Sequence, residues 1–121
     1  LAAIYTASDV VWMATYGEGF GVPVIEAQAC GTRVIASDWA ATADLVAEDS
    51  FKVQGQPFWD EPQKAFYQIP ILADLVEALQ NAYEADRGTS TVARSFALQF
   101  DTEAVWEGFW LPFFKDYLAR A

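Results

Sequence analysis

Two carboxylates stand close together in one short, glycine-rich stretch, at Glu18 and Glu26. Three glycines alternate with other residues over 17–21, and Pro23 follows them. Glycine lets a backbone approach a ligand closely and take positive φ angles, and proline opens a helix without losing a needed hydrogen bond. The stretch therefore predicts a tight loop that runs into the start of a helix. Free backbone N–H groups and the helix dipole make such a place suitable for an anion, phosphate in particular.

Two apolar runs of strand type flank this loop and helix, at 9–14 and 33–37. They predict the order strand, tight loop, helix, strand. The loop then follows the carboxyl end of a strand, which is where open α/β sheets bind their ligands. A further short strand is expected at 51–53.

The glycine-rich stretch resembles the signature of a known enzyme family. EGFGVPVIEA at 18–27, followed by ACGT at 29–32, is similar to the signature of the family 4 retaining glycosyltransferases, in which seven residues separate two glutamates. The likeness continues through 5–11 and 34–38, and it thins after about Lys52. In that family the signature lies in the C-terminal, nucleotide-sugar-binding domain of the GT-B fold. The resemblance implies transfer of a sugar from a nucleoside-diphosphate donor.

Glu26 matches the second glutamate of that signature, which binds the nucleotide ribose in the family. We expect it in the first turn of the helix, where its carboxylate can accept charge-assisted hydrogen bonds from both hydroxyls of a ribose diol. The alternative is a solvated carboxylate that the helix N-terminus favours. The resemblance also implies that donor sugar and pyrophosphate contact the backbone N–H groups of the intervening residues. The donor-binding candidates are Gly19, Phe20, Gly21, Val22 and Glu26, and for Phe20 a purely packing role is the alternative.

Glu18 matches the first glutamate of the signature, which faces the donor sugar in relatives. It is the catalytic candidate, because it can contact sugar hydroxyls or stabilise positive charge on the sugar as the bond to the leaving phosphate breaks. In a front-face mechanism the leaving phosphate assists deprotonation of the acceptor. That mechanism needs no protein nucleophile, so we assign Glu18 to donor contact. An exposed turn carboxylate is the alternative.

The expected fold class is α/β. The chain of 121 residues is expected to be a single domain over 1–121, a Rossmann-like half with about three parallel strands flanked by helices. C-terminal helices are expected to pack on this sheet. In a sheet of order 3-2-1-4-5-6 the strands at 10–14, 33–37 and 51–53 are strands 4, 5 and 6. The chain is therefore read as a partial C-terminal domain, with 10–14 as an open apolar edge through which it self-associates.

The second half of the chain predicts an ordered loop and then helices. Prolines and aromatic residues over 54–70 suggest a long loop packed by its own side chains. Helices are expected over 71–85 and 90–99, and another from Thr102 onward. The last helix carries an aromatic stripe at three- and four-residue steps, which is read as core rather than as a ligand site, with part of it having met an absent N-terminal domain. The stripe consists of Trp106, Phe109, Trp110, Phe113, Phe114 and Tyr117. Gly108 and Pro112 predict a kink in it.

Composition narrows the possible partners and cofactors. The net charge is −10 and the chain has no His, which argues against nucleic acid or an anionic membrane as a partner. The lone Cys30 excludes an internal disulfide, and no zinc-type cluster is visible. We therefore expect no metal and no cofactor, with the nucleotide sugar as donor substrate. No signal peptide or membrane span is apparent, so cytoplasmic is the default location.

Several parts of the family pattern are absent. The basic residues that hold the donor diphosphate have no counterpart at matching positions, and the acceptor-binding N-terminal domain is missing. Residues 39–44 replace a glycine-rich turn and glutamate that many relatives carry. The isolated chain is therefore expected to be inactive or a feeble binder. The alternative is a non-catalytic assembly module on the same scaffold, and another GT-B enzyme such as a sugar-nucleotide epimerase fits less well.

Overall fold

A parallel three-stranded sheet forms the centre of the protein, in the order β1-β2-β3. The computed structural model describes residues 1–120. The strands are β1 (Val10–Met13), β2 (Arg33–Ser37) and β3 (Phe51–Val53). The connections are α2 (Val22–Ala29), between β1 and β2, and the 3₁₀ helix η1 (Ala40–Asp44), between β2 and β3. This arrangement confirms the predicted α/β class and its short parallel sheet.

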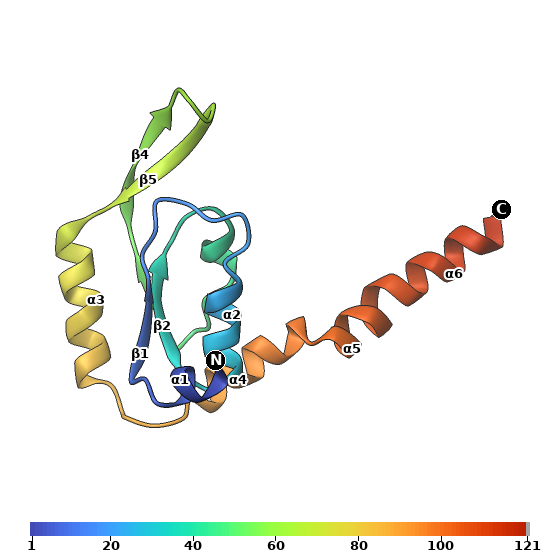
Figure 1. The fold of residues 1–121 in the computed structure, drawn as a ribbon, viewed down its shortest axis with the longest axis horizontal. Helices are drawn as coiled ribbons and strands as arrows, with labels where there is room; N and C mark the ends of the chain where they lie inside the picture. Colours follow the sequence, from blue (N-terminus) through green and yellow to red (C-terminus); the bar gives the residue numbers. More distant parts are fainter. Residues whose placement is uncertain (121) are drawn as a thin grey trace.

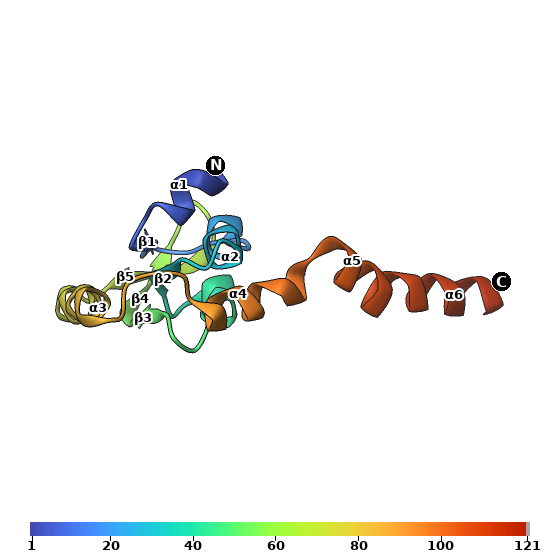
Figure 2. The same ribbon diagram turned by 90° about the horizontal axis from the view of Figure 1, so that it is seen from below.

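Helices cover both faces of the sheet, because alternate strand residues point to opposite sides. On one face α1 (Ala2–Thr6) and α2 pack over Val34 and Ala36. On the other, α3 (Leu72–Glu84) packs over Ile35. Figures 1 and 2 show α3 and α2 on opposite sides of the strands.

The β1 edge of this sheet has no strand partner within residues 1–120. β1 pairs only with β2 within residues 1–120, and its Trp12 is 44% exposed. An unpaired strand presents a row of free N–H and C=O groups. The open edge agrees with the sequence analysis, while self-association through it stays a prediction.

The predicted loop over 54–70 is in fact a β-hairpin. β4 (Gly55–Asp60) and β5 (Ala65–Pro70) pair antiparallel, with Phe58 opposite Tyr67. The prolines had suggested a loop, but a two-stranded ribbon tolerates proline because both of its strands are edges. The alternating aromatic residues are the signal that favoured strands.

The end of the chain projects away from the sheet. α4 (Thr91–Ala97) packs on α2, and the 3₁₀ turn η2 (Leu98–Phe100) follows it. Beyond them α5 (Thr102–Val105), the π-helical turn η3 (Trp106–Trp110) and α6 (Leu111–Arg120) extend outward (Figures 1 and 2). C-terminal packing on the domain is therefore confirmed for α3 and α4 only. No helix of residues 1–120 is long and apolar enough to cross a membrane.

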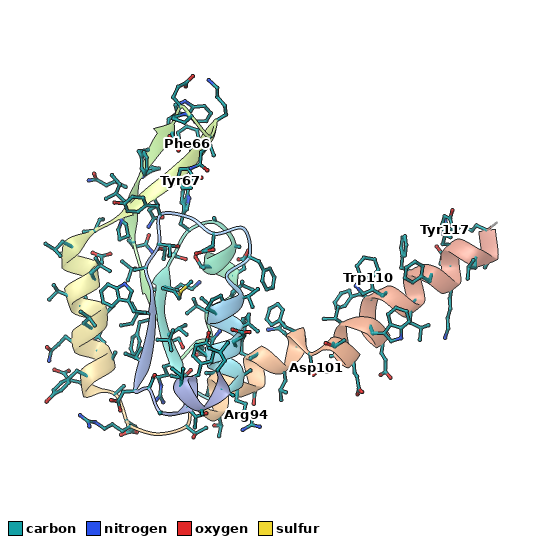
Figure 3. All side chains as sticks on the ribbon, in the orientation of Figure 1. Phe66, Tyr67, Arg94, Asp101, Trp110 and Tyr117 are labelled. Atoms are coloured by element: carbon teal, nitrogen blue, oxygen red, sulfur yellow. The ribbon has the colours of Figure 1, made fainter. Side chains whose placement is uncertain are left out.

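The aromatic stripe lies on this projecting part. Interpreting it as core was wrong for this chain, since none of its rings is buried and Phe109 is 72% exposed. Figure 3 shows Trp110 and Tyr117 on the projecting helix, apart from the sheet. Where a kink was expected, Leu111 N–H bonds the carbonyl of Trp106 five residues earlier, in the π-helical turn. Such a wider turn accommodates Pro112, which cannot donate an ordinary helical hydrogen bond.

All six members of the stripe are exposed: Trp106, Phe109, Trp110, Phe113, Phe114 and Tyr117.

A buried glutamine fastens α2 to the segment after η1. The side chain of Gln28 has no solvent exposure, and its Nε2 donates to the carbonyls of Val24 (3.1 Å) and Leu45 (2.7 Å). Its Oε1 accepts from the backbone N–H of Ala47 at 2.7 Å. Each buried polar group in this network therefore has a partner, as a dry interior requires.

We predict that Gln28→Leu lowers the free energy of unfolding by about 2 to 4 kcal/mol. The change leaves the Leu45 carbonyl and the Ala47 N–H buried without partners. Urea denaturation of both proteins measures the difference. Gln99→Leu, at an exposed position, is the control and should change little. A Gln28→Leu protein as stable as the native one would contradict the role given to this amide.

Ala40, at the start of η1, holds a strained backbone. Its φ is 51°, in the left-handed region that favours glycine. It lies in the segment 39–44, where many relatives were expected to carry a glycine-rich turn. The chain keeps the glycine-like conformation without the glycine.

Ala40→Gly should therefore stabilise the protein, by about 0.5 to 1 kcal/mol. The free energy gained by relieving the left-handed strain exceeds the entropic cost of the extra freedom that glycine gives the unfolded chain. Thermal and urea unfolding measure the change. Ala73→Gly, within α3, is the matched control and should instead cost about 1 kcal/mol. Destabilisation by both changes would show that Ala40 is unstrained.

Candidate functional site

The glycine-rich segment connects the carboxyl end of β1 to the start of α2. Gly21 caps α2 with a φ of 92°, so only glycine takes this conformation without strain. A Cβ at this position would also lie 3.0 Å from Cγ2 of Thr42. Thr42 is fixed in turn, because its hydroxyl donates to the carbonyls of Ser37 and Trp39, both at 2.8 Å. η1 therefore sets where α2 begins.

The three glycines of the segment are present for different reasons. Gly21 needs its positive φ, whereas Gly17 and Gly19 do not have one, contrary to the expectation for the whole loop. A Cβ on Gly17 would lie 2.9 Å from the ring of Tyr67. A Cβ on Gly19 would meet nothing within 4 Å. Nothing in the fold of this chain explains a glycine at position 19, where the backbone is open to solvent.

The backbone N–H groups of this segment are free. None of those from Gly17 to Val22 bonds an acceptor within residues 1–120, and Gly21 gives α2 no side-chain cap. Pro23, within the first turn, has no N–H to satisfy. The first N–H groups of a helix carry partial positive charge, so this group of donors is suited to an anion.

Glu18 lies in the middle of the segment, half-buried. Its carboxylate makes no hydrogen bond or ion pair with any residue of 1–120. Phe20 is 48% exposed and meets Phe100 edge-on at 6.1 Å, so η2 supports it from behind. Val22, the first residue of α2, is exposed. The predicted loop residues therefore lie together at one place, and most of them are open to solvent.

Glu26 lies further along α2 than expected. It is the fifth residue of the helix, and the first turn contains no acidic residue, so its expected place in that turn was wrong. Its Oε2 accepts a hydrogen bond from the hydroxyl of Tyr5 at 3.0 Å. No contact joins its carboxylate to that of Glu18 within residues 1–120. Glu26 is thus held by α1 rather than by the loop.

The hydroxyl of Tyr5 is affected by this arrangement. Burial and, after it, the hydrogen bond to Glu26 raise the pKa of the Tyr5 phenol above its ordinary value. Sequence analysis missed Tyr5 as a partner, because positions 5–11 were noted only for their likeness to the family. Its hydroxyl was the only signal, and nothing local to it indicates a partner 21 residues away.

A second group of polar side chains lies where β2 and β3 end. Lys52 Nζ is 3.5 Å from Oδ1 of Asp38 and also donates to the carbonyl of Ala43. Gln54 Nε2 donates to Oδ2 of Asp38 at 2.5 Å. The lysine is therefore already paired with a carboxylate. This pairing gives no reason to assign Lys52 the role of the basic residues that hold the donor diphosphate in the family.

Two cavities within residues 1–120 lie away from the glycine-rich segment. One of about 490 Å³ lies at the amino ends of the strands, between Asp9, Arg33 and Phe51 on the sheet and Tyr83 on α3. Another, of about 320 Å³, lies between β3 and α3. The glycine-rich segment lines neither of these two cavities.

The fold and this loop define half of a Rossmann-like α/β domain, and comparison with known families identifies the class. A model of the family described as glycosyl transferases group 1 matches residues 1–67, more than half of the chain. The chain therefore belongs to that family. The match covers the sheet, the glycine-rich segment, both glutamates and most of the hairpin.

Curated relatives agree with this assignment. A D-inositol 3-phosphate glycosyltransferase of Rhodococcus erythropolis is 60% identical over 57 residues, covering 46% of this chain and 13% of that protein. Its namesake from Salinispora arenicola is 46% identical over 55 residues, again 46% of this chain and 12% of the relative. The matched part is thus about an eighth of the length of these relatives. Family and relatives favour a glycosyltransferase domain over an assembly module.

We predict that Glu26→Gln lowers the pKa of Tyr5, because the carboxylate no longer favours the protonated phenol. Since the folded pKa is raised, the stability that it contributes is present below about pH 10 and is lost as pH rises further. NMR titration of ¹³C-labelled tyrosine measures the shift, and Tyr5→Phe assigns the signal. An unchanged Tyr5 pKa in Glu26→Gln would contradict the hydrogen bond.

Proposed function

We propose that this chain is the donor-binding part of a family 4 retaining glycosyltransferase of the GT-B fold. It binds a nucleoside-diphosphate sugar at the glycine-rich segment, and a hexosyl group passes to an acceptor bound elsewhere in the protein. One observation carries the proposal: free N–H groups lead into the N-terminus of α2 beside an unpartnered Glu18. We also propose that the protein is cytoplasmic and that it needs no cofactor.

The pyrophosphate of the donor is held by the free N–H groups near Gly19 to Val22. Gly19 supports this role, because the open space at its Cα lets phosphate oxygens approach the backbone. As the bond to the sugar breaks, negative charge grows on the leaving phosphate, and fixed N–H donors stabilise it. Lys52 contributes little here while Asp38 holds it.

Glu26 accepts hydrogen bonds from the ribose diol of the nucleotide. The Tyr5 hydroxyl occupies one position on Oε2, and Oε1 remains available as an acceptor. Tyr5 thereby limits the rotation of the carboxylate before the nucleotide binds. Bonds to an ionised carboxylate are roughly twice as strong as those between neutral groups.

Glu18 faces the donor sugar. When the bond between the anomeric carbon and the phosphate oxygen breaks, its electron pair leaves with the phosphate and positive charge develops on the sugar. The Glu18 carboxylate stabilises that charge. The acceptor hydroxyl attacks from the same face and gives its proton to the leaving phosphate, so the configuration is retained without a protein nucleophile.

The acceptor is not assigned. The names of the curated relatives specify D-inositol 3-phosphate for those proteins. The matched stretch contains the donor segment, so it supports sugar transfer and says little about what receives the sugar.

An NMR-detected titration tests the proposal. UDP-glucose, GDP-mannose and ADP-glucose are added in turn to the ¹⁵N-labelled chain. One of them should shift the amide signals of residues 18–22 and of Glu26 in a saturable way. Glu26→Ala should weaken that binding by about ten- to a hundredfold, since a charge-assisted bond is lost. Glu107→Ala, on the projecting helix, is the matched carboxylate control and should bind like the native chain.

Two results would count against donor binding. One is the absence of saturable shifts with all three nucleotide sugars. The other is binding to Glu26→Ala that equals binding to the native chain, which would remove Glu26 from the site.

A further inference from the structure

The β4–β5 hairpin stands beside the loop that carries Glu18. Figures 1 and 3 show it rising from the end of the sheet where β1 runs into the glycine-rich segment, with Phe66 and Tyr67 on its second strand. The backbone N–H of Gln68 donates to the carbonyl of Tyr16 at 2.9 Å. The ring of Phe58 meets that of Tyr16 edge-on at 5.9 Å. Both strands of the hairpin therefore contact the loop.

Tyr67 makes the closest approach. Its Cδ1 would lie 2.9 Å from a Cβ on Gly17, so any larger residue at 17 would displace the ring or the loop. Phe58 packs on the same ring, with centroids 5.9 Å apart. The Tyr67 hydroxyl donates to Oε1 of Gln63 at 2.5 Å, which ties the ring to the turn of its own hairpin. The ring thus has a fixed position against the loop.

The hairpin is itself fastened to the sheet. The side chain of Gln68 is buried, and its Nε2 lies 3.4 Å from the carbonyl of Val53 at the end of β3. The N–H of Ile71 donates to the carbonyl of Gln54 at 2.9 Å, which closes the base of the hairpin. The base of the hairpin is therefore fixed to the sheet.

Few backbone bonds hold the loop near Glu18. The hydroxyl of Ser37 donates to the carbonyl of Thr15 at 2.5 Å, and no backbone N–H from Gly17 to Val22 bonds an acceptor within residues 1–120. The hairpin contacts Tyr16 and Gly17, and Glu18 is the next residue in the chain. Since its carboxylate has no partner within residues 1–120, the path of its backbone decides where it points.

We propose that the hairpin positions Glu18, with Tyr67 and Gln68 as the positioning residues. This inference rests on the proposed function, because it assigns the hairpin a role in donor binding. Tyr67 covers one side of Gly17, and Gln68 holds the carbonyl of Tyr16. Together they present the Glu18 carboxylate to the sugar of the donor without touching the sugar themselves.

The test measures loop order and donor binding separately. ¹⁵N relaxation gives order parameters for residues 17–20, and the titration with UDP-glucose, GDP-mannose and ADP-glucose gives affinity. Tyr67→Ala should lower the order parameters of Glu18 and Gly19 below about 0.6, the range of flexible backbone. It should also weaken binding of the responding sugar nucleotide by about tenfold or more, as expected when a contact group is misplaced.

Three further variants separate positioning from folding. Tyr67→Phe keeps the ring, so its loop order parameters and its donor affinity should equal those of the native chain. Phe66→Ala, an exposed neighbour at 62% exposure, should leave both readouts unchanged. Gly17→Ala places a Cβ against the Tyr67 ring from the loop side, so it should weaken donor binding although Tyr67 itself is unchanged.

The outcomes are distinguishable. Native order parameters in Tyr67→Ala overturn the positioning role alone. Loss of loop order with unchanged donor affinity also overturns it, because the position of Glu18 then has no effect. Failure of the native chain to bind all three sugar nucleotides overturns donor binding, and the role of the hairpin falls with it.

Discussion

The buried amide of Gln28 is the interaction on which the candidate site depends. It joins α2 to residues 45–47, directly after η1, and every buried polar group involved finds a partner. With this segment held in place, η1 is fixed beside the start of the helix. Thr42 of η1 then lies against Gly21 and fixes the turn from which α2 begins. Gln28, almost two helical turns from the start of α2, therefore sets the direction of the free N–H groups.

The loop is supported at its two ends and open in its middle. Tyr67 of the hairpin covers Gly17, Thr42 lies against Gly21, and nothing approaches Gly19. A ligand that binds there meets donors already in position, so it does not have to order the backbone itself. Catalytic and binding groups are effective when the surrounding structure fixes them in advance. Gly17 and Gly21 thus have different structural reasons, and the open space at Gly19 belongs to the proposed donor site.

The sequence predicted what depends on local pattern. Apolar runs located the three strands, and glycines followed by Pro23 located the loop and the start of α2. It could not predict contacts between distant residues: Tyr5 with Glu26, or Tyr67 with Gly17, because neither partner marks the other locally. The hairpin was missed because its prolines outweighed its alternating aromatic residues. The terminal aromatic stripe shows a further limit, since periodicity identifies an apolar helix face but not what covers it.

Charge and site geometry point to one mode of recognition. The net charge of −10 repels a nucleoside-diphosphate sugar at long range, and Asp38 already pairs with Lys52 near the carboxyl edge of the sheet. Long-range attraction therefore cannot draw the donor to this chain. The interactions that remain for recognition are short-range. They come from the directional N–H groups at the start of α2 and from the Glu26 carboxylate, which Tyr5 holds in place. If the proposed function is correct, donor recognition by this part of the protein depends on the fixed geometry of those groups, and the contacts that keep the loop rigid matter as much as the groups that touch the donor.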